Sequence, residues 1–253
     1  MFFDVKNHIL YGTKPFCMCA DDENMALVMA FNAYENGCRF ILATPPHSAF
    51  LSAGMYEQVR LTRLVDMIHS YLPDMQIGLG CELECTRDNI DQLIRYLDSH
   101  RLPTLHGTRW VLVSFPENVS REDLWYVLDR LDRSGYAPVL SHAETLRCLD
   151  LNEIRCLKGE GPRDDSKYRF RCRIQLDTYS LHPSDPHREQ AENLIRCRLV
   201  DVLGTNARNT SSFPGYIQPA IESMKTLCSE DYLNRICCLN AAHMLDIPVP
   251  VSQ

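Results

Sequence analysis

Four residues of types that bind metal ions stand where apolar, strand-like runs of the chain end: His8, His47, Glu82 and His142. Imidazole and carboxylate groups that arrive from several strands are the ligands that a multinuclear hydrolytic site needs. Metal ions held there generate hydroxide near neutral pH and neutralise the charge on a phosphoryl oxygen. The pattern therefore points to metal-assisted hydrolysis, provided that further ligands complete the set.

The other strand ends carry residues that do not complete such a set: Lys6, Ser114, Asn206 and Arg208. Lys6 and Arg208 add fixed positive charges where metal ions would sit, and they disfavour cations by Coulomb repulsion. The same two cations could form an anion clamp that binds a phosphate, a carboxylate or a phosphotyrosine without hydrolysing it. Nothing else in this set obviously activates a water molecule.

Some of these residues have a structural interpretation beside the functional one. Glu82 follows an apolar run and needs a partner if it is buried, so we favour an ion pair with Lys6 or Arg208 over a metal-binding role. His142 is either a metal ligand or a hydrogen-bonded histidine at a strand end, and the sequence leaves both open. Glu144 is expected at the start of a helix, where a carboxylate suits the helix dipole.

The elements that must position these residues alternate along the chain. Seven strand-like runs are separated by helical stretches: 2–5, 39–43, 76–80, 110–113, 137–140, 172–176 and 200–203. This alternation predicts parallel βαβ units rather than an antiparallel sandwich. In βα-barrels the loops after the strands converge on one face, so we expect the residues at the strand ends to lie close together.

The expected helices carry recognisable start and stop signals. Asp21-Asp22 precedes a periodic apolar run, and Gly37 follows it as an expected C′ residue. Ser120 and Asp123 resemble a capping box at the start of a second helix. A third helix is predicted from about residue 55 to 72, with apolar residues at helical spacing.

The composition is that of a globular α/β protein. The chain has 253 residues, is 45% hydrophobic, and carries a net charge of −7 without a long basic cluster, which argues against nucleic-acid binding. We predict a single domain over residues 1–253. The start lacks a signal-peptide pattern, and no apolar run approaches the roughly 20 residues that span a bilayer, so a cytoplasmic location is expected. The polar stretch 158–167 is predicted to be a surface loop.

Twelve cysteines are present, but a long chain without an export signal is expected to keep them as free thiols. Cys38, Cys81 and Cys172 lie in or beside apolar runs, where a reduced cysteine behaves as a small hydrophobic residue. Cys17 and Cys19 lie in a loop-like stretch, and this spacing alone is a weak metal-binding signal.

The ordered motifs resemble the PHP-domain, manganese-dependent protein-tyrosine phosphatases that accompany capsule and exopolysaccharide operons in Gram-positive bacteria. The resemblance covers nearly the whole chain. It rests on the segments DVKNHIL, ILATPPH, GLGCELECT, LPTLHGTRWVLVSFP, GYAPVLSHAET, RIQLDTYSL and DVLGTNARN. Each match is weak alone, but their shared order and separations are specific. The resemblance implies a distorted (β/α)7 barrel of the PHP type.

Carried over from the family, the metal ligands are only partly present. His8, Glu82 and His142 match family ligands, while the family histidine of A-T-P-H falls on Pro46, with His47 displaced by one residue. The remaining family ligands are replaced, at the positions Lys6, Ser114, Asn206 and Arg208. An arginine that contacts phosphate in the family is replaced by Thr145. The loss of two carboxylates removes charge that would offset the repulsion between neighbouring metal ions.

The resemblance and the residues together predict a tyrosine-phosphatase-like protein of capsule or exopolysaccharide regulation, catalytically impaired or inactive, that is, a pseudoenzyme. The partner implied is a phosphotyrosine protein or a bacterial tyrosine kinase. The alternative is an active metal-dependent phosphotyrosine-protein phosphatase that uses a reduced mono- or dinuclear site. Manganese or zinc at reduced occupancy, or no cofactor at all, is compatible with this set of residues.

Overall fold

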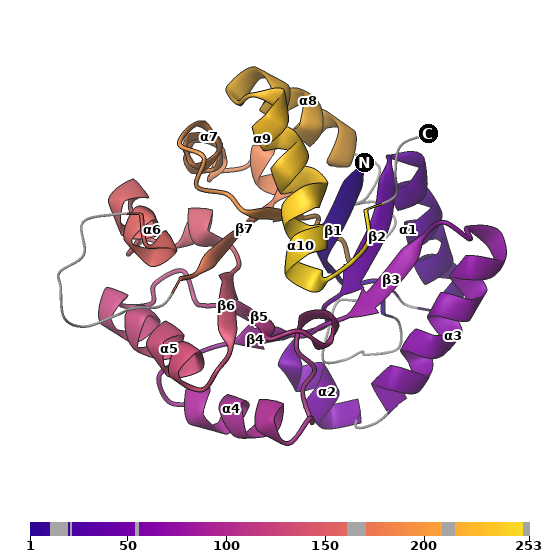
Figure 1. Cartoon of the computed structure of the whole chain (residues 1–253), viewed down its shortest axis with the longest axis horizontal. Helices are drawn as coiled ribbons and strands as arrows, with labels where there is room; N and C mark the ends of the chain where they lie inside the picture. The colour runs from indigo at the N-terminus through magenta and orange to yellow at the C-terminus, as the bar shows by residue number, and fades with distance from the viewer. Residues whose placement is uncertain (11–19, 21, 54–55, 161–170, 209–215, 250–253) are drawn as a thin grey trace.

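Parallel strands form the centre of the molecule, and helices surround them (Figure 1). The computed structural model describes residues 1–10, 20, 22–53, 56–160, 171–208 and 216–249. The strands are β1 (Phe2–Asn7), β2 (Cys38–Ala43), β3 (Gln76–Leu79), β4 (Glu82–Glu84), β5 (Trp110–Ser114), β6 (Ala137–Leu140), β7 (Arg173–Asp177) and β8 (Val202–Gly204). They make one sheet of the order β1-β2-β3 and a second that runs in chain order from β4 to β8. The predicted α/β class with parallel strands is confirmed.

Short bridges link the two sheets at both edges, near the carboxyl ends of the strands. Asn7 pairs with Ala207 and Pro46 pairs with Glu82, each in parallel orientation. The backbone N–H of Glu82 donates to the carbonyl of Pro45 at 3.0 Å, and that of His8 donates to the carbonyl of Ala207 at 2.9 Å. These links place the ends of the strands around a common centre, in the distorted ring visible in Figure 1.

Helices connect most successive strands on the outside of this ring, and the last three helices follow the last strand. The helices are α1 (Glu23–Glu35), α2 (His47–Ala53), α3 (Tyr56–Tyr71), α4 (Ile90–Asp98), α5 (Arg121–Arg133), α6 (Leu151–Lys158), α7 (Arg188–Arg196), α8 (Ile217–Leu227), α9 (Glu230–Asn234) and α10 (Asn240–Leu245). The predicted start signals are confirmed, because Asp22 accepts a hydrogen bond from Met25 N and Ser120 accepts one from Asp123 N. Gly37 follows α1 with a φ of +86°, a conformation that glycine adopts at little cost.

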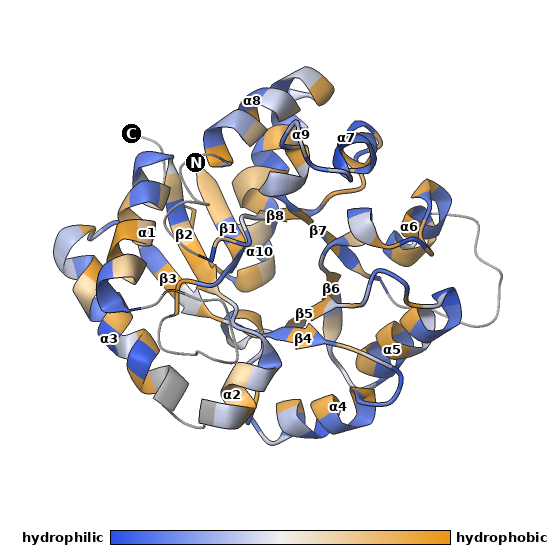
Figure 2. Cartoon of the chain, turned by 180° about the vertical axis from the view of Figure 1, so that it is seen from behind, coloured by the Kyte–Doolittle hydropathy of each residue, from blue (hydrophilic) through white to orange (hydrophobic). Residues whose placement is uncertain are grey.

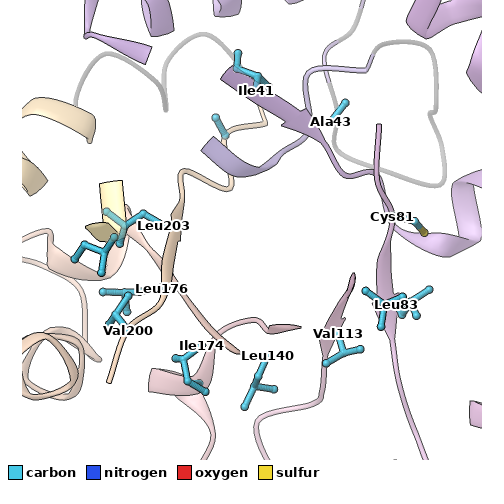
Figure 3. Packing of buried hydrophobic residues seen from close by; sticks show 14 of the residues in the cluster. Ile41, Ala43, Cys81, Leu83, Val113, Leu140, Ile174, Leu176, Val200 and Leu203 are labelled. Atoms are coloured by element: carbon cyan, nitrogen blue, oxygen red, sulfur yellow. The ribbon is translucent and has the colours of Figure 1, made fainter. Parts of the chain in front are cut away.

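Alternate residues of the strands belong to two separate apolar clusters, one outside and one inside the ring. Outward-facing residues pack under the surrounding helices, and Figure 3 shows Leu83, Leu140 and Leu176 among those that point away from the centre of the ring. Inward-facing residues, such as Val5 and Leu112, pack against one another and against α10. Figure 2 shows that hydrophobic residues gather on the strands and on the helix faces turned toward them. The interior is therefore filled by side chains, and the polar site lies above this filling.

Some details differ from the sequence-based expectations. The predicted strands did not include β4, because its three residues Glu82–Glu84 are too few and too polar to show a strand pattern. Lys158, which was expected in a surface loop, is the last residue of α6, while residues 161–167 lie outside the described part. Cys17 and Cys19 also lie outside it, and the ten cysteines of the described part are free thiols, as predicted.

No helix of the described residues has the length and apolar character that crossing a bilayer requires.

Candidate functional site

Lys6 is the centre of a polar cluster at the carboxyl ends of the strands. Its side chain is fully buried, and its Nζ lies 3.0 Å from Glu82 Oε1 and 2.9 Å from Ser141 Oγ. The same Nζ also contacts Nε2 of His142. An ammonium group has three protons, and these three acceptors use all of them. The predicted ion pair between Lys6 and Glu82 is thus confirmed.

Five side chains close a ring of hydrogen bonds that starts and ends at Lys6. Ser141 Oγ, which accepts from Lys6, donates to Gln175 Oε1 at 2.7 Å. Gln175 Nε2 then donates to Asp177 Oδ1 at 2.7 Å, and Asp177 Oδ2 lies 3.2 Å from Nδ1 of His142. His142 completes the ring by accepting from Lys6 through Nε2. This arrangement assigns the proton of a neutral His142 to Nδ1.

The charges of the cluster are consistent with this arrangement. Burial alone would raise the pKa of Glu82, but the Lys6 ammonium and the nearby histidines lower it to about 2. Burial also raises the pKa of Asp177, and the effects of His142, Lys6 and the Gln175 hydrogen bond outweigh it, so that this pKa is lowered. The pKa of His142 is lowered, mainly by burial. The Lys6 ammonium is therefore bonded directly to the carboxylate of Glu82, and a neutral His142 lies between it and the carboxylate of Asp177.

His8 and Asn206 form a second pair beside this ring. Nε2 of His8 lies 3.0 Å from Oδ1 of Asn206, so the imidazole donates to the amide oxygen. Burial is the main cause that lowers the pKa of His8 to about 4. The negative charge of Glu82 acts to raise this pKa, whereas the positive charges of Lys6 and Arg208 lower it further. A neutral His8 that donates from Nε2 does not offer that nitrogen to a metal ion.

The remaining predicted positions do not join the ring. His47 begins α2, and its Nδ1 accepts a hydrogen bond from the backbone N–H of Glu84 at 3.2 Å. Pro46 pairs through its backbone with β4, as described above. Ser114 ends β5 and is buried, and its carbonyl accepts from Cys85 N at 2.9 Å. Thr145 Oγ1 donates to the carbonyl of His142 at 3.0 Å. The structure thus joins Lys6, Glu82 and His142 by direct contacts, while His47 lies near Glu82 and contacts the backbone of Glu84 instead.

These residues do not fit a metal ion, which the resemblance implied. Lys6 already neutralises Glu82, and Nε2 of His142 already accepts a hydrogen bond from Lys6. The amide oxygen of Asn206 is used by His8. Across the described residues, no group of three or more His, Cys, Asp or Glu side chains is arranged to hold a metal ion. An ammonium and a divalent cation cannot share one buried carboxylate without strong repulsion.

Glu144 is another buried carboxylate, close to Asp177. It was expected at the start of a helix, and it lies in the first turn of the short helix Ala143–Thr145, where its side chain is buried. Its Oε1 accepts from Ser180 Oγ at 2.7 Å, whereas its Oε2 has no hydrogen-bond partner among the described residues. Burial and the neighbouring Asp177 raise the pKa of Glu144 to about 7.

A pocket of about 440 Å³, called here the carboxyl-end pocket, opens beside the ring. His142 and Asp177 line it, together with Arg208, His187 and Thr205. The predicted anion clamp is wrong for Lys6, because its three protons are used inside the protein and its side chain is fully buried. Arg208, which lines the pocket, can still meet an anion there.

Two tyrosines give the carboxyl-end pocket an aromatic wall. Tyr179 and Tyr216 both line the pocket, and their rings meet edge to face with centroids 4.4 Å apart. The ring of His182 stacks on Tyr179 at 5.4 Å. An aromatic group of a ligand can pack against such a wall, while Arg208 supplies a cation for a negative charge.

Sequence reasoning missed the ring members Ser141 and Gln175 and the aromatic wall. One available signal was the period of two in strands: Gln175 and Asp177 occur at alternate positions of an apolar run and so share one face. Ser141 precedes the retained His142 directly, at the end of β6. The residues of the wall follow β7 and precede α8, and no local pattern indicates that they meet.

The comparisons with known proteins agree with this fold. A model of the protein family described as "Capsular polysaccharide synthesis, CpsB/CapC" matches residues 2–246. The tyrosine-protein phosphatase CpsB of Streptococcus pneumoniae is 24% identical over 236 residues, which cover 87% of this chain and 88% of that protein. The protein of the same name from Streptococcus agalactiae is 21% identical and covers 96% of this chain and 97% of its own length.

A solved structure shares the same architecture. It belongs to work on YwqE from Bacillus subtilis and CpsB from Streptococcus pneumoniae, described as "unique metal-dependent tyrosine phosphatases". The superposition has a TM-score of 0.72 at 23% identity and covers 99% of this chain and 100% of the other. At this identity the likeness establishes the fold, and the chemistry has to be argued from the residues of this chain.

Proposed function

Since the chain belongs to the CpsB/CapC family of capsular polysaccharide synthesis, we propose that it acts in that process as a phosphotyrosine-binding protein with little or no phosphatase activity. Its partner is a protein phosphorylated on tyrosine, such as a bacterial tyrosine kinase. The single observation that carries this proposal is the buried Lys6 ammonium, bonded to Glu82, Ser141 and His142. It stands among the residues that would otherwise hold metal ions and activate water.

The carboxyl-end pocket supports the binding half of the proposal. Arg208 and His187 can contact a phosphate group there, and Tyr179 and Tyr216 can pack against the phenyl ring that carries it. The volume of about 440 Å³ suits one amino-acid side chain with its phosphate.

The first experiment measures hydrolysis of a phosphotyrosine peptide after the protein has been loaded with manganese or zinc. The His142→Ala variant serves as the control, and bound metal is measured by elemental analysis. We expect no turnover above that of the variant. Turnover in the native protein that disappears in His142→Ala would instead establish the active-enzyme alternative with a reduced metal site.

The second experiment measures binding of the same peptide by fluorescence anisotropy. Arg208→Gln is expected to weaken binding by at least about tenfold, because a charge-assisted hydrogen bond is lost. Arg196→Gln, on the exposed side of α7, is the matched control and should bind like the native protein. Equal affinity for the phosphorylated and unphosphorylated peptides would contradict the proposal.

A further inference from the structure

A second pocket, of about 520 Å³, lies at the opposite ends of the strands from Lys6. It is called here the amino-end pocket, because Trp110 is the first residue of β5 and Arg173 the first residue of β7. The last residues of the same strands, Ser114 and Asp177, lie at the other end of the molecule. A ligand in this pocket would therefore not touch the site described above.

A buried carboxylate fixes two cations in the wall of the amino-end pocket. Asp201 Oδ2 lies 2.6 Å from Nζ of Lys158, and its Oδ1 lies 2.8 Å from Nη1 of Arg173. The backbone N–H of Ile174 also donates to Asp201 at 2.9 Å. The Lys158 side chain is only 6% exposed. Because one carboxylate carries one negative charge, it offsets only one of these two positive charges.

Three guanidinium groups line the amino-end pocket: those of Arg109, Arg171 and Arg173. Arg109 and Arg173 both lie near the ring of Trp110, with their guanidinium carbons 5.9 and 5.8 Å from its centroid. This contact restricts both side chains to the region of the pocket. Within the described part of the chain, neither Arg109 nor Arg171 forms an ion pair.

The lining carries an excess of positive charge in a protein whose net charge is −7. Four cationic side chains (Arg109, Lys158, Arg171 and Arg173) line it with the carboxylates of Asp132 and Glu160, and the ion-paired Asp201 offsets a third positive charge, so the excess is one positive charge. Glu160 is exposed, so water screens its charge more than that of the buried Lys158. The amino-end pocket therefore has an electrostatic preference for anions.

We propose that the amino-end pocket is a binding site for the phosphate group of a small phosphorylated ligand. Phosphate matches guanidinium groups in bidentate geometry, and a fixed ammonium adds a point charge. The volume suits a metabolite or nucleotide rather than a protein segment. This inference concerns a different end of the molecule and does not depend on the proposed phosphotyrosine site.

The test uses the full chain and follows the fluorescence of Trp110. The chain has two tryptophans, so the Trp125→Phe variant leaves Trp110 as the only reporter. Titration with pyrophosphate is expected to give a saturable change in emission. Parallel titrations with ADP and with inorganic phosphate distinguish a nucleotide from a free phosphate as the source of the group, and citrate tests for carboxylate binding.

Variants then separate the two ends of the molecule. Arg109→Gln combined with Arg171→Gln is expected to weaken pyrophosphate binding by at least about tenfold. Arg208→Gln, in the carboxyl-end pocket, and Arg196→Gln, on α7, should leave the titration unchanged. If Trp125→Phe does not fold, calorimetry on Arg208→Gln with both tryptophans gives a second measurement without the cation of the carboxyl-end pocket. No saturable change in Trp110 emission or in heat in that background, a change that survives the double variant, or preference for citrate would overturn the proposal.

Discussion

Each proton of the Lys6 ammonium meets a different acceptor, and the acceptors come from two strands: Glu82 from β4, and Ser141 and His142 after β6. A buried ion pair contributes little by itself when it is intact, but removing one partner leaves a buried charge without compensation. The effect of a substitution at Lys6 therefore depends on what happens to Glu82, whose side chain is only 8% exposed.

Lys6→Met keeps the length of the side chain and removes its charge. We expect it to lower the free energy of unfolding by about 3–5 kcal/mol at neutral pH, measured by urea denaturation. Lys225→Met is the matched control, because Lys225 is 54% exposed and pairs with an exposed Glu222, and it should cost less than about 1 kcal/mol. Lys6→Met with Glu82→Gln should be more stable than Lys6→Met alone. Equal costs at Lys6 and Lys225 would disprove a structural role of the ring.

Glu144 gives a prediction about pH. Its pKa is raised from 4.5 to about 7, so the folded protein holds this proton more tightly than the unfolded chain does. The stability from this group is fully present below about pH 4.5 and is lost as the pH rises through about 7. In the native protein this group should lower the free energy of unfolding by roughly 1–3 kcal/mol between pH 5 and 8, and Glu144→Gln should remove that decrease. Urea denaturation over this pH range measures it, and parallel profiles for both proteins would contradict it.

At the scale of elements, the sequence predicted most of the fold because its strands are apolar and its helices carry caps. It predicted an ion pair of Glu82 with Lys6 or Arg208 because all three stand at strand ends, which parallel topology brings together, and the structure selects Lys6. It did not predict Gln175 or Ser141 as partners of Lys6. Which side chains meet inside a ring of strands depends on register and on the direction of each side chain, and neither is visible in a linear motif.

Gly204 shows how closely β8 approaches β1. A Cβ atom at this position would lie 2.6 Å from Cβ of Lys6 and 2.9 Å from Nε2 of Gln175. Gly204→Ala must therefore shift the strand or the ring, at a cost of about 1–3 kcal/mol in unfolding free energy. Gly204→Val should cost more than Gly204→Ala, because its side chain is larger. Urea denaturation tests both, and a valine variant as stable as the native protein would show that β8 can move away freely.

The two ends of the strand ring differ in how far their positive charges are compensated. The carboxyl end holds a closed network in which one ammonium compensates Glu82 and the histidines are neutral. The amino end holds guanidinium groups without ion-pair partners in the described part of the chain. The inner apolar cluster, which packs against α10, fills the interior of the ring.

A protein whose central cation is built in should not respond to manganese. A metal ion that binds only the folded state at 100 times its Kd adds about 2.7 kcal/mol of stability. For a chain of this size, that would raise the Tm by several degrees. We expect manganese and EDTA to leave the Tm unchanged in thermal denaturation. A manganese-dependent rise that is lost in His142→Ala would show that the imidazole still binds metal.

The closed ring around Lys6 also limits which evolutionary paths are open to this chain. Replacing Lys6 by histidine would leave Glu82 without its cation and Ser141 without its donor, before any metal ligand is complete. Restoring a carboxylate at Ser114 first would add a further buried negative charge. Both of these single steps toward a metal site thus pass through a less stable intermediate. Single substitutions are therefore expected to preserve the network around Lys6 rather than to convert it into a metal site.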